Sequence, residues 1–296
     1  MTIYLKRSTD VGAPSLTNSA GSLITLLDYL FVTTMSWTKP YTGTNKAAYK
    51  QPSGTNQFYL RVDDTGTTNA SVVGYETMSD VDTGTGPFPT AAQVSGGLYW
   101  PKSSSGSAAP WIFLSNGKIG YLFVKYNGTN WLCVGFGDFS TYKTSDAYHT
   151  LIIGETSAPS STTVFSNLAT SITSANTGHY VARSYTQIGS AINVGKFSNY
   201  ILAAAVSNLG AGGCTYPAPV DGGLHLAPVW ISETTSGVGA RGLLPGIWSP
   251  MHNRPLTHGD TFSGTGSLSS RNFEAVDLGS AVYQVFIETS DTWGGF

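Results

Sequence analysis

The stretch that most constrains the fold runs from Trp111 to Phe136, WIFLSNGKIGYLFVKYNGTNWLCVGF. It contains three short apolar runs separated by two Asn-Gly pairs, Asn116-Gly117 and Asn127-Gly128. Both central residues of a type I′ turn need a positive φ, which Asn and Gly tolerate best. The pattern therefore predicts three antiparallel strands joined by two tight turns, and it favours an all-β chain.

The middle run of this stretch, Ile119–Tyr126, is apolar on both faces. Tyr121 and Phe123 point to one side, and Leu122 and Val124 point to the other. A strand of this kind must be covered on both sides, either by its own chain or by another chain.

The sequence is poor in charge, and this has two interpretations. Charged residues make up 11% of the chain, against about 25% in a typical soluble domain. The chain is either a neutral, hydroxyl-rich β protein or a subunit whose surface largely faces other subunits, since interface cores are depleted in charge. We favour the second because the deficit coincides with strands that need covering on both faces. A net charge of −2 without a basic block argues against nucleic-acid binding.

Residues 1–40 are expected to form an N-terminal arm with a short helix. A possible strand at Ile3–Leu5 is followed by apolar residues at helical spacing, with Asn18 or Ser19 as the candidate N-cap. The helix either packs against its own sheet or docks onto a neighbouring subunit. The candidate partner contacts are its apolar stripe and one aromatic pair: Leu23, Leu26, Leu27, Leu30, Phe31, Tyr99 and Trp100.

Similar motifs recur in the same order in the two halves of the chain, which suggests an internal repeat. The matched segments are Phe88-Pro89 with Tyr216-Pro217, residues 96–101 with 222–228, residues 110–112 with 228–231, and residues 137–140 with 246–249. We therefore predict two similar antiparallel β-sandwich or barrel-like domains in tandem. The first covers residues 41–155 and the second covers residues 179–296, with a Ser/Thr-rich linker or strap at 156–178.

Two serine–histidine pairs have the residue types of a hydrolase. Ser140 is followed nine residues later by His149, and Ser249 is followed at the same spacing by His258. Because the Gly-x-Ser-x-Gly elbow is missing and the doubling favours a structural role, we expect no enzymatic activity.

Two loops carry side chains of the types that bind metals. His252, His258 and Asp260 can supply three ligands, and Ser79–Gly84 weakly resembles a calcium loop that lacks its distal Glu. In both loops, hydrogen bonds to the backbone are the more ordinary interpretation. The two cysteines form no Cys-x-x-Cys motif, so neither zinc nor a disulfide framework is expected. We expect no metal and no cofactor.

Aromatic residues on strand-like runs have a default and an alternative interpretation. Tyr99-Trp100, Trp111 and Trp131 are expected to pack in the core. The alternative is an exposed platform that binds a host-surface glycan.

Several motifs resemble a group of structural proteins from tailed bacteriophages. The resemblance covers most of the chain and rests on the order of its motifs: the arm YLKRSTDVGAPSLTNSAGSLITLLD, Ser36–Pro40, Phe58–Asp64, Tyr75–Gly84, LPGIWSPMH and THGDTFSG. It implies a virion protein of the tail, baseplate or collar. It transfers no catalytic residues to this chain.

The sequence thus favours a multi-copy virion structural protein made in the host cytoplasm. Its expected partners are other virion proteins and copies of itself. The alternatives are a host-glycan-binding attachment module and a capsid decoration protein. The longest apolar run, Leu23–Val32, is too short to span a bilayer and contains Asp28, and the N-terminus does not resemble a signal peptide. We therefore expect no membrane association.

Overall fold

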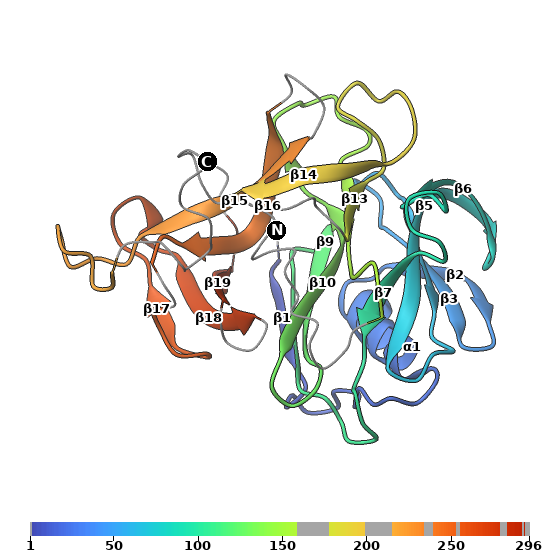
Figure 1. The fold of residues 1–296 in the computed structure, drawn as a ribbon, viewed down its shortest axis with the longest axis horizontal. Coiled ribbons are helices and arrows are strands. Elements are labelled where there is room, and N and C mark those ends of the chain that lie inside the picture. Colours follow the sequence, from blue (N-terminus) through green and yellow to red (C-terminus); the bar gives the residue numbers. More distant parts are fainter. Residues whose placement is uncertain are drawn as a thin grey trace.

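The computed structural model describes residues 2–158, 178–198, 215–233, 239–252, 255–278, 283–291 and 293. Within these residues the chain forms two antiparallel sheets and one short α-helix (Figure 1). This confirms the prediction of an all-β, antiparallel fold with a short helix near the N-terminus.

The smaller sheet is built from residues 38–101. Its strand order is β2-β3-β4-β5-β6, with β7 also paired to β5. In β4, Leu60 and Val62 are buried and their neighbours are half-buried, which is the alternation of a strand with one covered face. The strands are β2 (Thr38–Gly43), β3 (Lys46–Lys50), β4 (Tyr59–Asp63), β5 (Asn69–Asp80), β6 (Thr83–Phe88) and β7 (Leu98–Pro101).

The larger sheet joins the N-terminal strand to the C-terminal half of the chain. Its order over the described residues is β1-β8-β9-β10-β12-β13-β14-β15-β16-β19-β18-β17, with β11 also paired to β16. The strands are β1 (Tyr4–Arg7), β8 (Trp111–Ser115), β9 (Ile119–Lys125), β10 (Trp131–Asp138), β11 (Ser140–Thr141), β12 (Thr150–Ile153), β13 (His179–Val181), β14 (Ile192–Ser198), β15 (Leu226–Glu233), β16 (Ala240–Pro250), β17 (Thr261–Ser263), β18 (Asn272–Leu278) and β19 (Tyr283–Glu288). A 3₁₀ turn, η2 (Gly266–Leu268), lies between β17 and β18.

The predicted β8-β9-β10 meander is present, but its turns are not of the predicted type. The first loop spans residues 116–119 rather than two residues. Gly117 takes a positive φ of 83°, whereas the Asn116 carboxamide oxygen accepts hydrogen bonds from the N–H groups two and three residues ahead, at 3.0 and 3.1 Å. Asn127 and Gly128 repeat this arrangement. Each Asn therefore acts through its side chain.

The helical segment lies between the two sheets. Helix α1 (Ser22–Leu27) continues as the π-helical turn η1 (Asp28–Thr34). The ring of Phe31 lies 5.5 Å from that of Tyr49 in β3 and 6.1 Å from that of Phe113 in β8, measured between centroids. The segment thus packs between the smaller sheet and the first strands of the larger one, and all three share one hydrophobic core.

A buried ion pair fixes the start of this helix. Asp64 Oδ2 accepts hydrogen bonds from the N–H groups of Leu23 and Ile24, at 2.8 and 3.3 Å. Lys102 Nζ lies 2.6 Å from Asp64 Oδ1, and neither charged side chain is exposed to solvent. The carboxylate therefore satisfies two helix N–H groups that have no partner within the helix.

The predicted N-cap at Asn18 or Ser19 is wrong. The helix begins at Ser22, after Gly21 in the left-handed conformation with a φ of 81°. The capping carboxylate belongs to Asp64, 41 residues further along the chain from Leu23, where a local sequence pattern cannot reveal it.

The larger sheet curves so that its C-terminal strands meet its first strands (Figure 1). The Arg7 guanidinium on β1 forms an ion pair with the Glu274 carboxylate on β18. The ring of Trp131 on β10 stacks on that of His258, with the centroids 4.8 Å apart. The C-terminal strands are thereby attached to the rest of the molecule by side chains as well as by the continuous sheet.

The chain itself covers both faces of β9. Every residue from Ile119 to Val124 is buried. The hypothesis that neighbouring subunits shield these strands is therefore wrong. Several of the scarce charged side chains pair inside the fold instead, for example Lys102 with Asp64 and Arg241 with Asp146.

The larger sheet is continuous across the predicted domain boundary. β12 pairs with β13, and β13 pairs with β14, so strands from both predicted domains share one sheet. Most of the predicted linker, residues 156–178, lies outside the described residues. The division into residues 41–155 and 179–296 therefore stays a prediction.

The two copies of the proposed repeat differ in strand direction. Trp111 and Gly137 lie on β8 and β10, which run the same way because both are antiparallel to β9. Their counterparts, Trp230 and Gly246, lie on β15 and β16, which are antiparallel neighbours. The match in sequence motifs thus does not extend to the topology of these strands.

Candidate functional site

The structure places most of the predicted partner contacts inside the chain. Trp100 is 1% exposed, and its Nε1 donates a hydrogen bond to the carbonyl of Ile153 at 2.8 Å. Tyr99 is half-buried. The apolar stripe is at most 1% exposed and packs between the sheets: Leu23, Leu26, Leu27, Leu30 and Phe31. The prediction that Trp100 and this stripe contact a partner is therefore wrong, because the chain's own sheets cover them. Of the two alternatives for the helix, packing on its own chain is correct.

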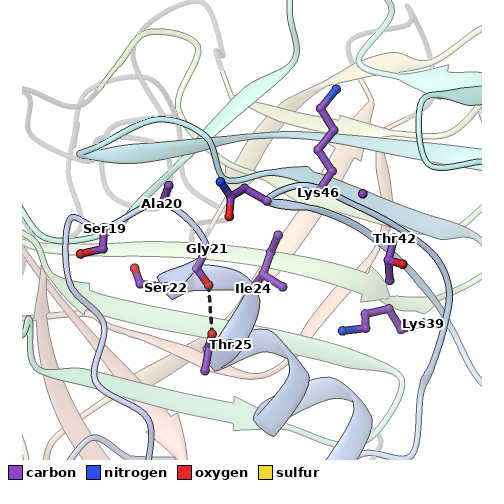
Figure 2. Close-up of a pocket in the computed structure, with 11 residues that line it drawn as sticks. Ser19, Ala20, Gly21, Ser22, Ile24, Thr25, Lys39, Thr42 and Lys46 are labelled. Carbon is purple, nitrogen blue, oxygen red and sulfur yellow. Dashed lines mark hydrogen bonds between the residues drawn. The ribbon is translucent and has the colours of Figure 1, made fainter.

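A shallow pocket lies between the start of α1 and the β2–β3 hairpin (Figure 2). Lys39 and Lys46 contribute its charges. Lys39 Nζ lies 2.6 Å from Asp28 Oδ2, and Lys46 Nζ lies 2.8 Å from Asp82 Oδ2. Because both ammonium groups are already paired with carboxylates, this pocket offers no unpaired charge to a ligand.

The first serine–histidine pair is held in other contacts. His149 Nδ1 is hydrogen-bonded to the carbonyl of Asp146, and its Nε2 lies 3.6 Å from Asp138 Oδ2. Ser140 is exposed on β11, where its backbone pairs with Leu243 of β16. The ring nitrogens of His149 thus tie a loop to β10, which is a structural role.

The second pair is held similarly. His258 Nδ1 accepts a hydrogen bond from the N–H of Asp277 at 3.1 Å, and its ring stacks on Trp131. Ser249 is completely buried, and its Oγ donates to the carbonyl of Pro250 at 3.2 Å. The geometry favours the structural interpretation for this pair also.

The three candidate metal ligands in the 252–260 loop make separate contacts. His252 Nδ1 is hydrogen-bonded to the carbonyl of Thr215 at 3.0 Å, and its Nε2 accepts from the N–H of His225 at 2.8 Å. Asp260 Oδ2 accepts from the N–H of Thr257 at 2.8 Å. In the part of the chain that the structure describes, no three His, Cys, Asp or Glu side chains converge as a metal site would require.

The segment that resembles a calcium loop, Ser79–Gly84, is the turn of the β5–β6 hairpin. Asp80 Oδ1 accepts a hydrogen bond from the next N–H at 2.6 Å. Asp82 lies 2.8 Å from Lys46 Nζ and 2.5 Å from Arg61 Nη2. The carboxylates therefore serve the turn and neighbouring cations, as the more ordinary interpretation predicts.

The named tryptophans do not form an exposed platform. Trp111 is 1% exposed and donates from Nε1 to the carbonyl of Pro14 at 3.1 Å, and Trp131 is 8% exposed. Their role is core packing, which was the default interpretation of the sequence.

A second, more enclosed pocket lies where the C-terminal strands approach the β8–β9 turn, and we call it the β16 pocket. It holds about 260 Å³. Residues of β11, β15, β16 and β19, among them Trp248 and Glu288, line it. Tyr142 after β11, Trp293 after β19 and Asn116 in the β8–β9 turn complete the lining. It is more enclosed than the pocket beside α1, and its lining combines aromatic residues with a carboxylate.

Trp293 takes its place in the β16 pocket because β16 has a glycine beside it. Gly246 has a φ of 76°, and a Cβ at this position would lie 2.3 Å from the Trp293 ring. Trp293 Nε1 donates a hydrogen bond to the carbonyl of Glu288 at 2.9 Å. A side chain at position 246 would therefore displace the indole.

Glu288 gives the β16 pocket its electrostatic character. Its side chain is 1% exposed. Oε2 accepts a hydrogen bond from Trp248 Nε1 at 3.0 Å and lies 3.4 Å from Arg271 Nη1. Oε1 is buried and accepts no hydrogen bond from the described residues. Burial raises the pKa of Glu288 above its usual value, although Trp248 and Arg271 act in the opposite direction.

Sequence reasoning missed this site. The alternation of Gln284 and Glu288 with apolar residues marks them as polar positions on the last strand, which is usually a sign of solvent exposure. In the structure both are buried, at 1% exposure each. The partner groups belong to Trp248 on β16 and to Arg271, which directly precedes β18, so no local pattern links them to Glu288.

Comparisons with known proteins do not assign the chain to a family. No family model matches it, and no curated protein matches it. Among the described residues, the helices are all too short or too polar to traverse a bilayer.

Proposed function

We propose that this chain is a structural protein of a tailed-bacteriophage virion, present in several copies in the tail, baseplate or collar. Its work is assembly rather than catalysis, and its partners are copies of itself and other virion proteins. The order of sequence motifs shared with that group supports the proposal. The structural observation that carries it is a set of apolar side chains exposed at loop tips.

Three loops each expose one branched apolar side chain. The relative exposure is 103% for Val11, 95% for Val220 and 78% for Ile188. Single exposed apolar residues are common on monomers. These three are distinctive because each lies in a loop between strands, where a neighbour can reach it without disturbing a sheet.

The three loops lie at separate ends of the molecule (Figure 1). The loop after β1 lies at the bottom of the view, the loop between β13 and β14 at the top, and the segment before β15 at the left. A subunit that touches several neighbours at once needs contact points distributed in this way. We call Val11, Ile188 and Val220 the loop-tip residues.

Assembly is expected to fail when a loop-tip residue becomes charged. The yield of phage particles that carry Val11→Asp, Ile188→Asp or Val220→Asp should fall at least about tenfold, because an unpaired charge buried in an interface costs several kcal/mol. The yield of complete particles from lysates is the measurement.

Two serines in the same loops provide matched controls. Ser15→Asp and Ser190→Asp add the same charge at exposed polar positions and should leave the yield unchanged. The melting temperature of each purified variant should match that of the original chain, since these side chains make little contact within it. Normal particle yields for all three loop-tip variants would contradict the proposal.

The same proposal separates the tail from the capsid. If the chain is a capsid decoration protein, the loop-tip variants should still form particles with tails but should lose the chain from the capsid surface. Mass spectrometry of separated heads and tails distinguishes the two locations.

A further inference from the structure

We infer that copies of this chain associate head to tail, with the loop that carries Ile188 on one copy seated in a groove beside β17 on the next copy. The inference rests on the multi-copy role proposed above and names the partner of one of its contact loops, which is a second copy of the chain. Three observations lead to it: a loop surface with an exposed apolar tip, an apolar groove elsewhere on the molecule, and charges of opposite sign at the two places.

The first surface consists of two loops that hold each other in place. In the β11–β12 loop, Lys143 Nζ donates a hydrogen bond to the carbonyl of Tyr185 at 2.7 Å. In the β13–β14 loop, Gln187 Nε2 donates to the carbonyl of Ser145 at 2.6 Å. The buried carboxylate of Glu233 also accepts a hydrogen bond from the N–H of Tyr185, at 2.6 Å. These loops are therefore preorganised, so a partner that binds them has little disorder to remove.

The two loops expose apolar and aromatic side chains to solvent. The relative exposure is 78% for Ile188, 57% for Tyr142 and 40% for Tyr185. Covering exposed apolar area is favourable, and tyrosine is enriched among the residues that dominate binding at interfaces. We call these three residues and Lys143 the Ile188 surface.

The second surface is a groove beside β17, which we call the β17 groove. It holds about 530 Å³, which is more than one isoleucine side chain fills. Its apolar lining is accessible, because Tyr216 is exposed and the other three side chains are only half-buried. One exposed carboxylate, that of Asp260, completes the described lining. The apolar residues are Tyr216, Leu224, Leu256 and Phe262.

The groove of the same chain is out of reach of Ile188. The β13–β14 loop lies at the top of the view and β17 lies at the lower left (Figure 1). A second copy can bring the two surfaces together. Because the surfaces differ, each contact leaves one Ile188 surface and one β17 groove free, so that further copies add to form a ring or a filament.

Charge complementarity favours this pairing. Lys143 and Asp260 form no ion pair among the described residues. The Lys143 ammonium group bonds a carbonyl and lies 5.8 Å from the centroid of the Tyr185 ring. Asp260 Oδ2 accepts a hydrogen bond from the N–H of Thr257. Opposite charges attract the two surfaces to each other, whereas two copies of either surface would meet with like charges.

The test is sedimentation velocity of the purified full-length chain at concentrations from about 1 μM to about 1 mM, which cover weak and moderate affinities. Species larger than a dimer are expected to appear as the concentration rises. A chain that stays monomeric throughout, or that stops at a dimer, would overturn the inference.

Exchanging the two charges locates the contact. Lys143→Glu and Asp260→Lys should each weaken association at least about tenfold, because each places like charges at the contact. The double variant should recover association, and so should an equimolar mixture of the two single variants, in which the copies alternate. Lys50→Glu is the matched control. It also removes a lysine from over a tyrosine ring, 5.5 Å from the centroid of Tyr59, but on β3 of the smaller sheet, and it should associate as the original chain does.

Ile188→Asp tests the apolar part of the contact without touching the groove. The side chain is 78% exposed, so the fold should survive, and association should weaken at least about tenfold. Unchanged association in this variant, or no recovery in either the double variant or the mixture, would overturn the inference. The virion role is judged separately by particle yield. A chain that never self-associates but whose Ile188→Asp variant loses particles would reject the head-to-tail contact alone.

Discussion

Replacing Arg241 by Met is expected to destabilise the chain by about 3–5 kcal/mol at pH 7. Arg241 is 1% exposed at its side chain, and it lies between two carboxylates that are completely buried, those of Asp146 and Glu233. Its Nε and Nη2 bond both oxygens of Asp146 at 2.8 Å, and its Nη1 bonds Glu233 Oε1 at 2.8 Å. The carbonyls of Arg183 and Tyr148 take the remaining two donors, so all five guanidinium N–H groups are used.

The loss in the Arg241→Met variant should depend on pH. Burial alone raises the pKa of Asp146, but the Arg241 guanidinium outweighs it and holds this pKa below its usual value. Without the guanidinium, burial raises the folded-state pKa of both carboxyl groups above the unfolded value. A carboxyl group whose folded-state pKa is raised in this way lowers the free energy of unfolding above its unfolded-state pKa. This destabilisation disappears at lower pH, where the group is protonated in both states. The destabilisation measured by urea unfolding should therefore shrink as the pH falls from 7 toward 4.

Two comparisons make this result specific. The triple variant Arg241→Met, Asp146→Asn, Glu233→Gln removes the buried charges together and should recover most of the lost stability. Arg183→Met breaks the ion pair with Glu76, in which the arginine side chain is 30% exposed, and should cost about 1 kcal/mol or less. A loss below about 1 kcal/mol for Arg241→Met, or one equal at pH 7 and pH 5, would contradict the structure of this network.

Replacing Glu155 by Gln is expected to stabilise the chain at alkaline pH. Glu155 is 7% exposed, and its Oε1 has no hydrogen-bond partner among the described residues. Burial raises the pKa of its carboxyl group to about 8, from 4.5 for an unperturbed glutamate. Its backbone pairs with Tyr99 through two hydrogen bonds, of 2.7 and 3.0 Å. These bonds join the end of β12 to β7, where the two sheets meet, so the side chain is held in the interior.

The sign follows from the raised pKa. Below pH 4.5 the carboxyl group is protonated in both states and costs nothing. Between pH 4.5 and pH 8 the unfolded chain releases the proton and the folded chain retains it, so stability falls as the pH rises. Above pH 8 the full penalty is present, at most about 5 kcal/mol for a shift of this size at 1.36 kcal/mol per pKa unit.

Urea unfolding of the two chains at several pH values is the measurement. The Glu155→Gln variant should match the original chain near pH 4 and should exceed it increasingly up to about pH 9. A stability difference that is constant between pH 5 and pH 9 would show that this carboxyl group is not buried as described.

Local patterns in the sequence were sufficient for the strands of the core. The apolar runs of the β8-β9-β10 meander and the helical spacing at Leu23–Phe31 each identified the correct element. They succeeded because side-chain periodicity follows directly from which face of a strand or helix is buried. The two turns of the meander were also placed correctly, because Asn and Gly mark chain reversals. Their lengths were not predicted, because turn length depends on the strand register, which the sequence does not encode locally.

The interior polar groups could not be predicted. Lys102 and Asp64 meet only when β7 and the loop after β4 converge at the start of α1, and Arg241 meets Asp146 across 95 residues of chain. Glu288 lies in the β16 pocket through the same kind of long-range packing. Charged residues are usually exposed, so no local pattern points to these buried pairs. This also explains the error about subunit faces: the scarcity of charge was attributed to interfaces, although the core strands are covered by the chain itself.

The most direct test of the virion role is a cryo-electron microscopy map of an intact particle whose genome encodes this chain. We predict density in the tail, baseplate or collar that fits the two sheets described above, with neighbouring subunits touching the loops that carry Val11, Ile188 and Val220. Helix α1 should remain enclosed between its own sheets. A particle from which the chain is absent, or one in which every neighbour contacts it only away from these loops, would contradict the account.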